Sequence, residues 1–251
     1  MKPSVWAGVD IGGTKTAVAI SAAPPVLLSR VEFPTLPAKG PEHTIRRIGD
    51  AIRESLISAG LAGDSLTAVG VSCGGPLDRV AGVIQSPPNL PTWDAVPLKE
   101  IFEGEFGVVC NVENDANAGA VAEHRYGAGK GTRNMVFLTM GTGLGAGIIA
   151  DGRLYRGASE MAGEIGHLRL TRSGPVGYNK AGSAEGWASG GGMPQVASRV
   201  MAAAKRRGER SVLEELIAAG GGLTPRDIAA AARRGDAVAQ RVLRATGTRL
   251  G

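Results

Sequence analysis

The sequence predicts an α/β protein with two related halves. Short apolar runs joined by glycine turns occur near the start of the chain and again near its middle, which is typical of β-hairpins. Longer segments with apolar residues at helical spacing lie between and after them. The 251 residues are enough for one large domain or for two lobes of about 100–150 residues each.

The first half begins with three predicted antiparallel strands. Val5 to Ile20 predicts two strands joined by Gly12-Gly13, and Leu27 to Phe33 predicts a third. Thr44 to Ala59 then predicts a helix, which we expect to end at Gly60. One apolar face of this helix contains Ile45, Ile48, Ile52, Leu56 and Ile57.

The rest of the first half contains two more strands and a second helix. Thr67 to Ser72 predicts a buried strand, and a Gly/Pro-rich segment from Gly74 to Pro91 follows it. Val108 to Val112 predicts another strand. Ala116 to Tyr126 predicts a helix rich in small residues.

The second half begins as the first one does. Met135 to Met140 and Leu144 to Ala150 predict two strands around a glycine turn, and aligning Gly12 with Gly141 gives an offset of 129 positions. This pattern indicates an internal duplication, although two glycine hairpins can also resemble each other by chance. From Ser189 onward the chain predicts helices, with a stop at Gly220–Gly222, a start at Thr224-Pro225 and a break at Gly235-Asp236.

Composition excludes several classes of function. The net charge is +5, but the basic residues lie in helical segments that also contain acidic residues, and no aromatic residues accompany them for base stacking. No apolar stretch approaches the roughly 20 residues that span a bilayer, and no signal-like segment opens the chain. We therefore expect a cytoplasmic protein without nucleic-acid or membrane partners. Cys73 and Cys110 lie in apolar runs, which predicts buried free thiols.

The two glycine turns are candidate phosphate-binding sites. Gly12-Gly13-Thr14, followed by Lys15, and Gly141-Thr142-Gly143 combine close backbone approach with amide and hydroxyl donors for anionic oxygens. One such hairpin alone is more often a plain tight turn, but two at equivalent places favour a nucleotide clamp. Neither matches the P-loop pattern, which disfavours that class of enzyme.

Asp10 precedes the first glycine turn at the end of an apolar strand. A carboxylate at this place is suited to hold Mg²⁺ through water, because hard cations prefer oxygen ligands and often keep their waters. The alternative is an aspartate that caps the turn.

Asp115 is the candidate general base. The segment Glu113–Asn117 follows a predicted strand and opens a helix, at the end of the strand where α/β proteins bind ligands. The helix dipole stabilises an ionised carboxylate in the first turn, so we expect Asp115 to be ready to accept a proton at neutral pH. The alternative is that Asn114 or Asp115 serves only as an N-cap.

Taken together, these motifs resemble the ROK family of sugar kinases and regulators. The resemblance covers nearly the whole chain and is most specific in the Gly-Glu-Ile-Gly-His box, which is followed by Glu185 and Ser189-Gly190. The matching segments, in order, are Val9–Thr16, Glu113–Asn117, Gly141–Gly145 and Ala162–His167.

The resemblance implies an actin-like, ribonuclease H-like duplicated fold with a cleft between two lobes, residues 1–114 and 115–251. It implies transfer of the γ-phosphoryl group of ATP to a hexose, such as glucose, commonly at the 6-hydroxyl. Asp115 resembles the catalytic base, and a homodimer is implied. The residues that resemble sugar ligands are Asn89, Asn114, Glu164, His167 and Glu185.

The sequence departs from the family pattern at two places. Most members carry a zinc-binding cysteine cluster after the histidine, but here Val176, Tyr178 and Ser183 occupy those positions, so we expect no zinc. We expect His167 to be oriented instead by a hydrogen bond from this substituted loop. Members also continue beyond the Asp236–Gly251 helix into a segment that contacts adenine, so we expect weaker ATP binding by this chain.

Three alternatives remain. A sugar-responsive regulator is disfavoured because the first phosphate motif begins at Val5, which leaves no room for a preceding helix-turn-helix. A catalytically impaired sugar-binding protein would keep the sugar ligands, and Asp115 argues only weakly against it. An acetate-kinase-like or chaperone-type relative would lack the Gly163–His167 box. The sequence does not determine which hexose is used.

Overall fold

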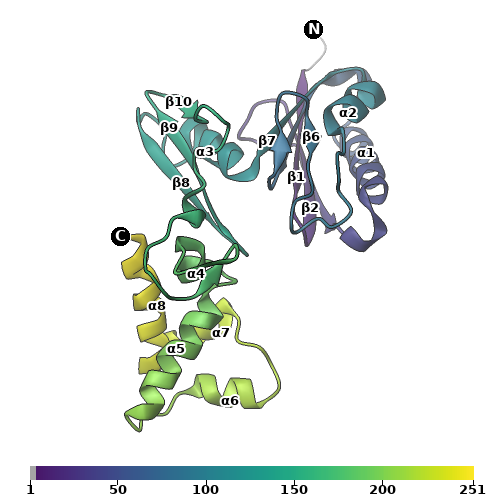
Figure 1. The fold of residues 1–251 in the computed structure, drawn as a ribbon. Helices are drawn as coiled ribbons and strands as arrows, with labels where there is room; N and C mark the ends of the chain where they lie inside the picture. The colour runs from purple at the N-terminus through teal and green to yellow at the C-terminus, as the bar shows by residue number, and fades with distance from the viewer. Residues whose placement is uncertain (1–3) are drawn as a thin grey trace. The chain divides into compact units, whose positions relative to one another are not determined.

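The structure is a computed structural model that describes residues 4–251, and it divides into two compact units. The first unit ends at Arg133 and the second begins at Asn134 (Figure 1). The helix Asp115–Tyr126, which begins within the segment Glu113–Asn117, therefore belongs to the first unit by its contacts. The division into functional lobes of residues 1–114 and 115–251 stays a prediction.

The first unit contains a mixed five-stranded sheet in the order β3-β2-β1-β4-β7. β1, β2 and β3 are antiparallel, as predicted, whereas β4 and β7 pair in parallel on the other side of β1. The strands are β1 Val5–Ile11, β2 Lys15–Ser21, β3 Ser29–Pro34, β4 Leu66–Cys73 and β7 Val109–Asn114. The Gly/Pro-rich segment adds a small hairpin, β5 Leu77–Asp78 and β6 Val83–Ile84.

The helices of the first unit are α1 Pro41–Ser58, α2 Leu98–Phe106 and α3 Asp115–Tyr126. α1 starts three residues before the predicted Thr44, with a proline in its first turn. Its buried face contains Ile45, Ile48, Ile52 and Leu56, but the prediction for Ile57 was wrong, since this side chain is 75% exposed. Successive helical residues lie about 100° apart, so Leu56 and Ile57 do not share one narrow face.

The second unit begins with a three-stranded antiparallel sheet in the order β10-β9-β8. Its strands are β8 Met135–Met140, β9 Leu144–Ala150 and β10 Arg153–Tyr155. Both ends of β9 lie 129 residues after those of β2, so the repeated hairpin predicted from the sequence is present in the structure. A short hairpin, β11 Val176–Gly177 and β12 Lys180–Ala181, follows the Gly163–His167 box.

The rest of the second unit is helical. The helices are α4 Ala184–Ala188, α5 Met193–Arg206, α6 Val212–Ala218, α7 Pro225–Arg233 and α8 Ala237–Leu250. The predicted start at Thr224 is confirmed, because its hydroxyl and the Asp227 carboxylate form a reciprocal capping box. α5 to α8 share an apolar cluster that includes Val196, Leu213, Ile228 and Val242.

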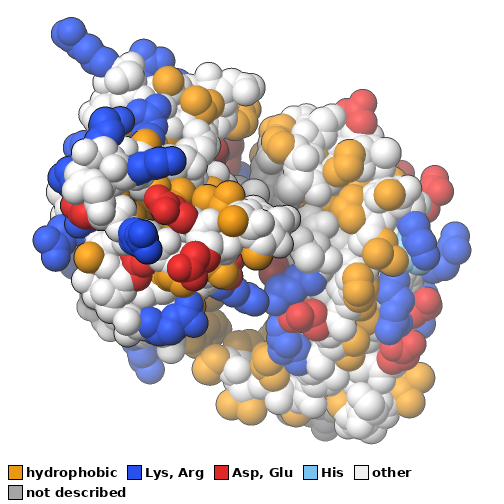
Figure 2. All heavy atoms as spheres, turned by 90° about the horizontal axis from the view of Figure 1, so that it is seen from below, with side chains coloured by type: hydrophobic (Ala, Val, Ile, Leu, Met, Phe, Trp, Pro, Cys, Tyr) orange, Lys and Arg blue, Asp and Glu red, His pale blue; other side chains and the backbone are white. Residues whose placement is uncertain are grey.

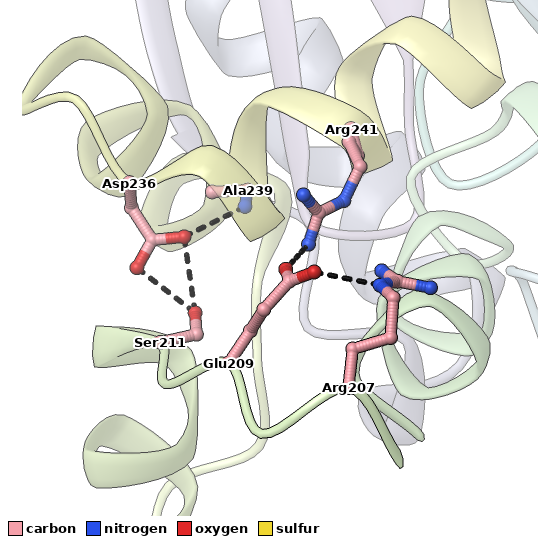
Figure 3. A network of polar contacts seen from close by, with 6 residues as sticks. All are labelled: Arg207, Glu209, Ser211, Asp236, Ala239 and Arg241. Atoms are coloured by element: carbon pink, nitrogen blue, oxygen red, sulfur yellow. Dashed lines mark hydrogen bonds and ion pairs between the residues drawn. The ribbon is translucent and has the colours of Figure 1, made fainter. Parts of the chain in front are cut away.

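A polar network joins the ends of these helices (Figure 3). Asp236 caps α8 by accepting from the Ala239 amide at 2.8 Å, and it also accepts from Ser211 Oγ, the N-cap residue of α6. Burial alone would raise the pKa of Asp236, but these hydrogen bonds outweigh it and lower the pKa. Glu209 pairs with Arg207 and Arg241 beside this cap.

The surface charges, the two cysteines and the hydropathy of the helices can be compared with the predictions from composition. Figure 2 shows basic side chains interspersed with acidic and hydrophobic ones on the face that it draws. Cys73 and Cys110 are free and buried, as predicted. Within residues 4–251, no helix has both the length and the hydropathy needed to cross a membrane.

Candidate functional site

The carboxyl ends of β1, β4 and β7 bring one group of predicted site residues together. Asp10 pairs with Ser72, which in turn pairs with Glu113, so the three strands end at the same edge of the sheet. Parallel strands place the residues that follow them on one side, and this is the usual ligand-binding edge in α/β proteins. Asp10 accepts a hydrogen bond from Ser72 Oγ at 3.1 Å.

The first glycine turn is fixed from behind by Thr35. Within the turn the Gly12 amide donates to the Lys15 carbonyl oxygen at 3.0 Å. Thr35 donates its hydroxyl to the Gly12 carbonyl oxygen at 2.6 Å, and its amide donates to the Thr14 carbonyl oxygen at 3.1 Å. Thr35 is fully buried, so these bonds hold the turn in one shape.

Asn89 and Asn114 both lie near the Gly74-Gly75 turn that follows β4. A Cβ on Gly74 would lie 3.8 Å from Asn89 Oδ1, and one on Gly75 would lie 3.9 Å from Asn114 Nδ2. A Cβ on Gly13 would lie only 2.6 Å from the Asn89 carbonyl oxygen. The loop that carries Asn89 therefore packs directly on the first glycine turn, and this packing requires glycine at position 13.

Asp115 is the first residue of α3, and Asn114 is its N-cap. Asn114 Oδ1 accepts from the amides of Ala116 and Asn117 at 3.0 and 3.2 Å. Asn114 therefore serves as the N-cap of α3, which is the alternative role considered for it from the sequence. Asp115 Oδ1 accepts from the Ala116 amide at 2.8 Å, which leaves its second carboxylate oxygen for other partners.

The pKa of Asp115 differs in direction from what the helix dipole alone would give. Asp115 is exposed to solvent by its accessible surface. The surrounding protein nevertheless desolvates the carboxyl and raises its pKa; the Ala116 amide opposes this effect, and the negative charge of Asp10 adds to it. The Ala116 amide of the helix N-terminus thus lowers the pKa, as expected, but desolvation by the surrounding protein outweighs it. A raised pKa makes a carboxylate a stronger base.

Lys15 pairs with a neighbouring strand in this structure. Its Nζ donates to Glu32 Oε2 at 3.2 Å, and the side chain is 61% exposed. An exposed ion pair of this kind contributes little to stability, so the ammonium group stays available to a stronger anionic partner. The cofactor-binding role of Lys15 stays a prediction.

The second glycine turn lies against the segment between α4 and α5. The Gly141 amide donates to the Gly143 carbonyl oxygen at 3.1 Å within the turn. The amides of Gly190 and Gly191 donate to the carbonyl oxygens of Gly141 and Thr142, at 2.8 and 3.1 Å. Two residues of the Ser189–Gly192 segment therefore hold this turn through its backbone.

Glu185 and the Gly163–His167 box are held against the same turn and strand. Glu185 Oε2 accepts from the Leu144 amide at 3.1 Å. Gly163 has φ of 93°, and its carbonyl oxygen accepts from the Ala146 amide at 3.0 Å. A Cβ on Gly163 would overlap the Ala146 carbonyl oxygen, so only glycine allows the box to approach β9 this closely.

The box places Glu164 and His167 near each other on a short 3-10 helix, Ile165–His167. Glu164 Oε2 lies 3.8 Å from His167 Nε2, which is beyond hydrogen-bond distance. The His167 ring stacks on Tyr178, with ring centroids 4.1 Å apart. From the substituted loop, Lys180 Nζ also donates to the His167 carbonyl oxygen at 2.7 Å. The expected hydrogen bond from this loop to the imidazole stays a prediction.

Sequence reasoning missed several residues that support these predicted sites. Thr35 and Ser72 support the first group, and Tyr178 and Lys180 support the second. Of these, only Tyr178 carried a signal, because it occupies a position where the family pattern has a metal ligand. Among residues 4–251, no three His, Cys, Asp or Glu side chains gather as a metal site.

The fold and these two groups of residues define an α/β protein with a duplicated architecture and two glycine turns, each fixed by hydrogen bonds from other parts of the chain. The chain belongs to the ROK family, which it matches over residues 6–251. It is 37% identical to a glucokinase of Streptomyces coelicolor over 238 residues, which cover 92% of this chain and 71% of that protein.

Solved structures support the same relationship. A ROK family glucokinase from Streptomyces griseus, in complex with glucose and AMPPNP, is 34% identical and superposes with a TM-score of 0.73. The match covers 97% of this chain and 75% of that one. The actin-like fold predicted from the sequence is thereby confirmed.

A repressor is also among the relatives. The xylose repressor of Caldicellulosiruptor bescii is 35% identical over 129 residues, which cover 51% of this chain and 32% of the repressor. Membership of the family therefore indicates a sugar-related protein, and the residues of the site must distinguish a kinase from a regulator.

Proposed function

We propose that this chain is an ATP-dependent kinase that phosphorylates a hexose, glucose or a close relative, at its 6-hydroxyl. The observation that carries the proposal is Asp115, a carboxylate of raised pKa that directly follows β7 and lies close enough to Asp10 for the charge of Asp10 to raise its pKa. The likeness to glucokinases supports the substrate class.

In the proposed reaction Asp115 accepts the proton of the sugar hydroxyl. The hydroxyl oxygen forms a bond to the γ-phosphorus of ATP as the bond to the β,γ-bridging oxygen breaks, and ADP leaves with that oxygen. Because one Asp115 oxygen accepts from Ala116, the carboxylate is held in a fixed orientation for this transfer. A positioned general base typically contributes about 10²–10⁴ in rate.

The two glycine turns are proposed to bind the phosphates of ATP. Gly12, Gly13, Thr14 and Lys15 form one turn, and Gly141, Thr142 and Gly143 form the other. Both turns are short, backbone-rich and held from behind, which suits them to anionic oxygens.

Asp10 fits a role in holding Mg²⁺ through water. Its carboxylate is exposed at a strand end, and the Ser72 hydroxyl contacts only one of its oxygens, Oδ1. Oxygen donors of this type suit a hard cation. When bound, Mg²⁺ supplies charge neutralisation to the phosphates.

The sugar is proposed to be held by carboxamides, carboxylates and an imidazole. These groups accept from or donate to pairs of hydroxyls, and this gives orientation as well as affinity. The residues concerned are Asn89 and Asn114 in the first unit and Glu164, His167 and Glu185 in the second. The homodimer implied by the resemblance stays a prediction.

The test is a coupled ADP-release assay with Mg²⁺-ATP and a panel of hexoses and N-acetylhexosamines. We expect turnover with one sugar, and a loss of roughly 10²-fold or more in kcat for Asp115→Asn, which keeps the shape and the hydrogen bond from Ala116. Asp50→Asn, on the exposed face of α1, is the matched control and should leave kcat unchanged. An Asp115→Asn variant within tenfold of wild type would contradict the assigned base.

The second candidate is a sugar-binding regulatory protein without catalysis. The similarity to a xylose repressor is the observation that favours it. Calorimetry that detects sugar binding, together with no ADP release for any sugar in the panel, would support this candidate over the kinase.

A further inference from the structure

The β11–β12 hairpin contains an unusual residue at its turn. Val176 pairs with Ala181 and Gly177 with Lys180, so Tyr178 and Asn179 form a two-residue turn. Both have positive φ, 47° and 57°. Turns of this type favour Asn and Gly, and Asn179 fits the preference, but a bulky tyrosine is disfavoured there. A side chain kept at a disfavoured position indicates a role outside the turn.

That role is visible in the contact that the Tyr178 ring makes. The ring stacks on the His167 imidazole with centroids 4.1 Å apart and planes inclined by 21°. Tyr178 is 63% exposed, so the ring is not there to fill a core. It covers one face of an imidazole whose side chain is itself 30% exposed. An aromatic pair of this geometry limits rotation of the histidine ring.

The hairpin is fixed tightly enough to hold that ring in place. Gln195 bonds both backbone groups of Val176: its Oε1 accepts from the Val176 amide, and its Nε2 donates to the Val176 carbonyl oxygen, each at 2.8 Å. Ser183 Oγ donates to the Gly177 carbonyl oxygen at 3.2 Å. Lys180 Nζ bonds the His167 backbone directly. The turn and the histidine are thus tied into one frame.

The hairpin also packs against the start of α4, which carries Glu185. A Cβ on Gly177 would lie 2.8 Å from the Glu185 Cβ and 2.5 Å from the Gly186 amide nitrogen. Ser183 caps α4 by accepting from that same amide at 3.0 Å. One short hairpin therefore contacts both His167 and the helical turn that positions Glu185.

The donor set of this segment does not fit the zinc that the family resemblance implies. Val176 has no ligand atom, the Ser183 hydroxyl is used in the cap of α4, and both cysteines of the chain lie in the first unit. A structural zinc site needs four donors, mostly thiolate and imidazole. Among the described residues, the contact that this segment makes with the imidazole is the stack on Tyr178.

We propose that Tyr178 is a positioning residue that orients His167 toward the sugar without a metal. The proposal rests on the proposed function, in which His167 contacts a sugar hydroxyl. The ring of Tyr178, rather than its hydroxyl, carries the effect, because the contact is a stack.

Two substitutions separate positioning from plain stability. Tyr178→Asn removes the ring and places a favoured residue in the turn, so we expect an unchanged or higher melting temperature together with a KM for the sugar raised roughly three- to tenfold, the scale of one aromatic pair. Tyr178→Phe keeps the ring and should stay within about twofold of wild type in KM. Tyr155→Ala, at another exposed tyrosine of the second unit, is the matched control and should change neither quantity.

Several outcomes would overturn the proposal. Tyr178→Asn with the KM of wild type would show that the ring does not position His167. A melting temperature that falls in Tyr178→Asn would indicate a structural role, and a Tyr178→Phe variant as impaired as Tyr178→Asn would assign the effect to the hydroxyl.

A readout independent of activity distinguishes failure of this proposal from failure of the proposed function. In proton–carbon NMR spectra, the His167 ring signals, assigned with His167→Gln, should be shifted upfield by the Tyr178 ring in wild type and Tyr178→Phe but not in Tyr178→Asn. The shift should persist after treatment with EDTA. Loss of the shift on chelation, or its absence in wild type, would refute the metal-free stack even for a protein that shows no turnover.

Discussion

The two glycine turns show how one local pattern can be held by different surroundings. β2 and β9 have bounds that differ by 129 residues at both ends. The turns themselves are not equivalent, because Ile11 pairs with Thr16 across four residues whereas Met140 pairs with Leu144 across three. The strands of the repeat are therefore alike, but the strand register differs by one residue.

The support behind each turn also differs. Thr35, from the end of β3, holds the first turn through the Gly12 carbonyl oxygen. The second turn is held by the amides of Gly190 and Gly191. Alternating apolar residues are enough to specify a strand, whereas the shape of a turn depends on the groups that bond to it from other parts of the chain.

The faces of the equivalent strands differ as well. Val9 and Ile11 of β1 are buried beneath helices of the first unit, but Leu138 and Met140, which are 129 residues further on, are 39% and 48% exposed. The apolar helices of the second unit pack mainly on one another. A duplicated sequence pattern thus does not ensure duplicated packing.

The largest expected effect on the free energy of unfolding comes from a glycine-to-alanine substitution, made separately in each of the two glycine turns. Gly13→Ala should lower the free energy of unfolding by about 3 kcal/mol, because the new Cβ would lie 2.6 Å from the Asn89 carbonyl oxygen. Gly141→Ala should change it by less than about 0.5 kcal/mol, since nothing lies within 4 Å of that Cβ. Denaturant unfolding of both variants measures the difference, and equal effects would remove the asymmetry between the turns.

Thr35→Val should have a smaller effect, confined to the first turn. It removes the hydroxyl that donates to Gly12 and contacts Thr16 Oγ1 at 2.9 Å, and it leaves buried polar atoms unpaired. We expect a loss of about 1–2 kcal/mol in unfolding free energy. Thr35→Ser keeps the hydroxyl and is the matched control. If Thr35→Ser loses as much unfolding free energy as Thr35→Val, the hydroxyl is not the cause of the loss.

The pH dependence of stability tests the desolvation of the Asp115 carboxyl. Its pKa is higher in the folded chain than the ordinary value of 3.8, so the folded state binds more protons between the two pKa values. The unfolding free energy contributed by this group therefore falls as pH rises through that interval. Asp115→Asn should be more stable than wild type at pH 7, with a difference that shrinks on acidification toward pH 4, as thermal melts can measure. A less stable Asp115→Asn variant would contradict this sign.

The smallest expected effect is a change in the rate at which the two cysteines, both in the first unit, react with an alkylating reagent. Burial raises the pKa of the Cys73 thiol to about 12 and that of Cys110 to about 11. Little thiolate forms at pH 8, so we expect iodoacetamide to label neither cysteine in the folded protein. Gly13→Ala should speed labelling, whereas Gly163→Ala, in the second unit, should not. Rapid labelling of wild type would contradict the burial of both thiols.

Much of the site could be predicted because its residues lie at the ends of recognisable strands. Asp10 follows the apolar residue Val9 near the end of β1, and Asp115 opens the helix that begins where β7 ends. Parallel pairing then brings the ends of these strands to one edge of the sheet. Asn89 could be assigned only through the family resemblance, since it lies in an irregular loop whose path is set by packing on Gly13.

The sequence by itself determined the repeated strands, the helices with strong start signals and the order of the motifs, because hydrophobic periodicity and capping act over a few residues. Only the tertiary structure decided the one-residue difference between the turns, the desolvation that raises the pKa of Asp115, and the stacking of Tyr178 on His167. Each of these depends on groups far apart in the chain, and local sequence carries no energy term for contacts between such groups until the fold brings them together.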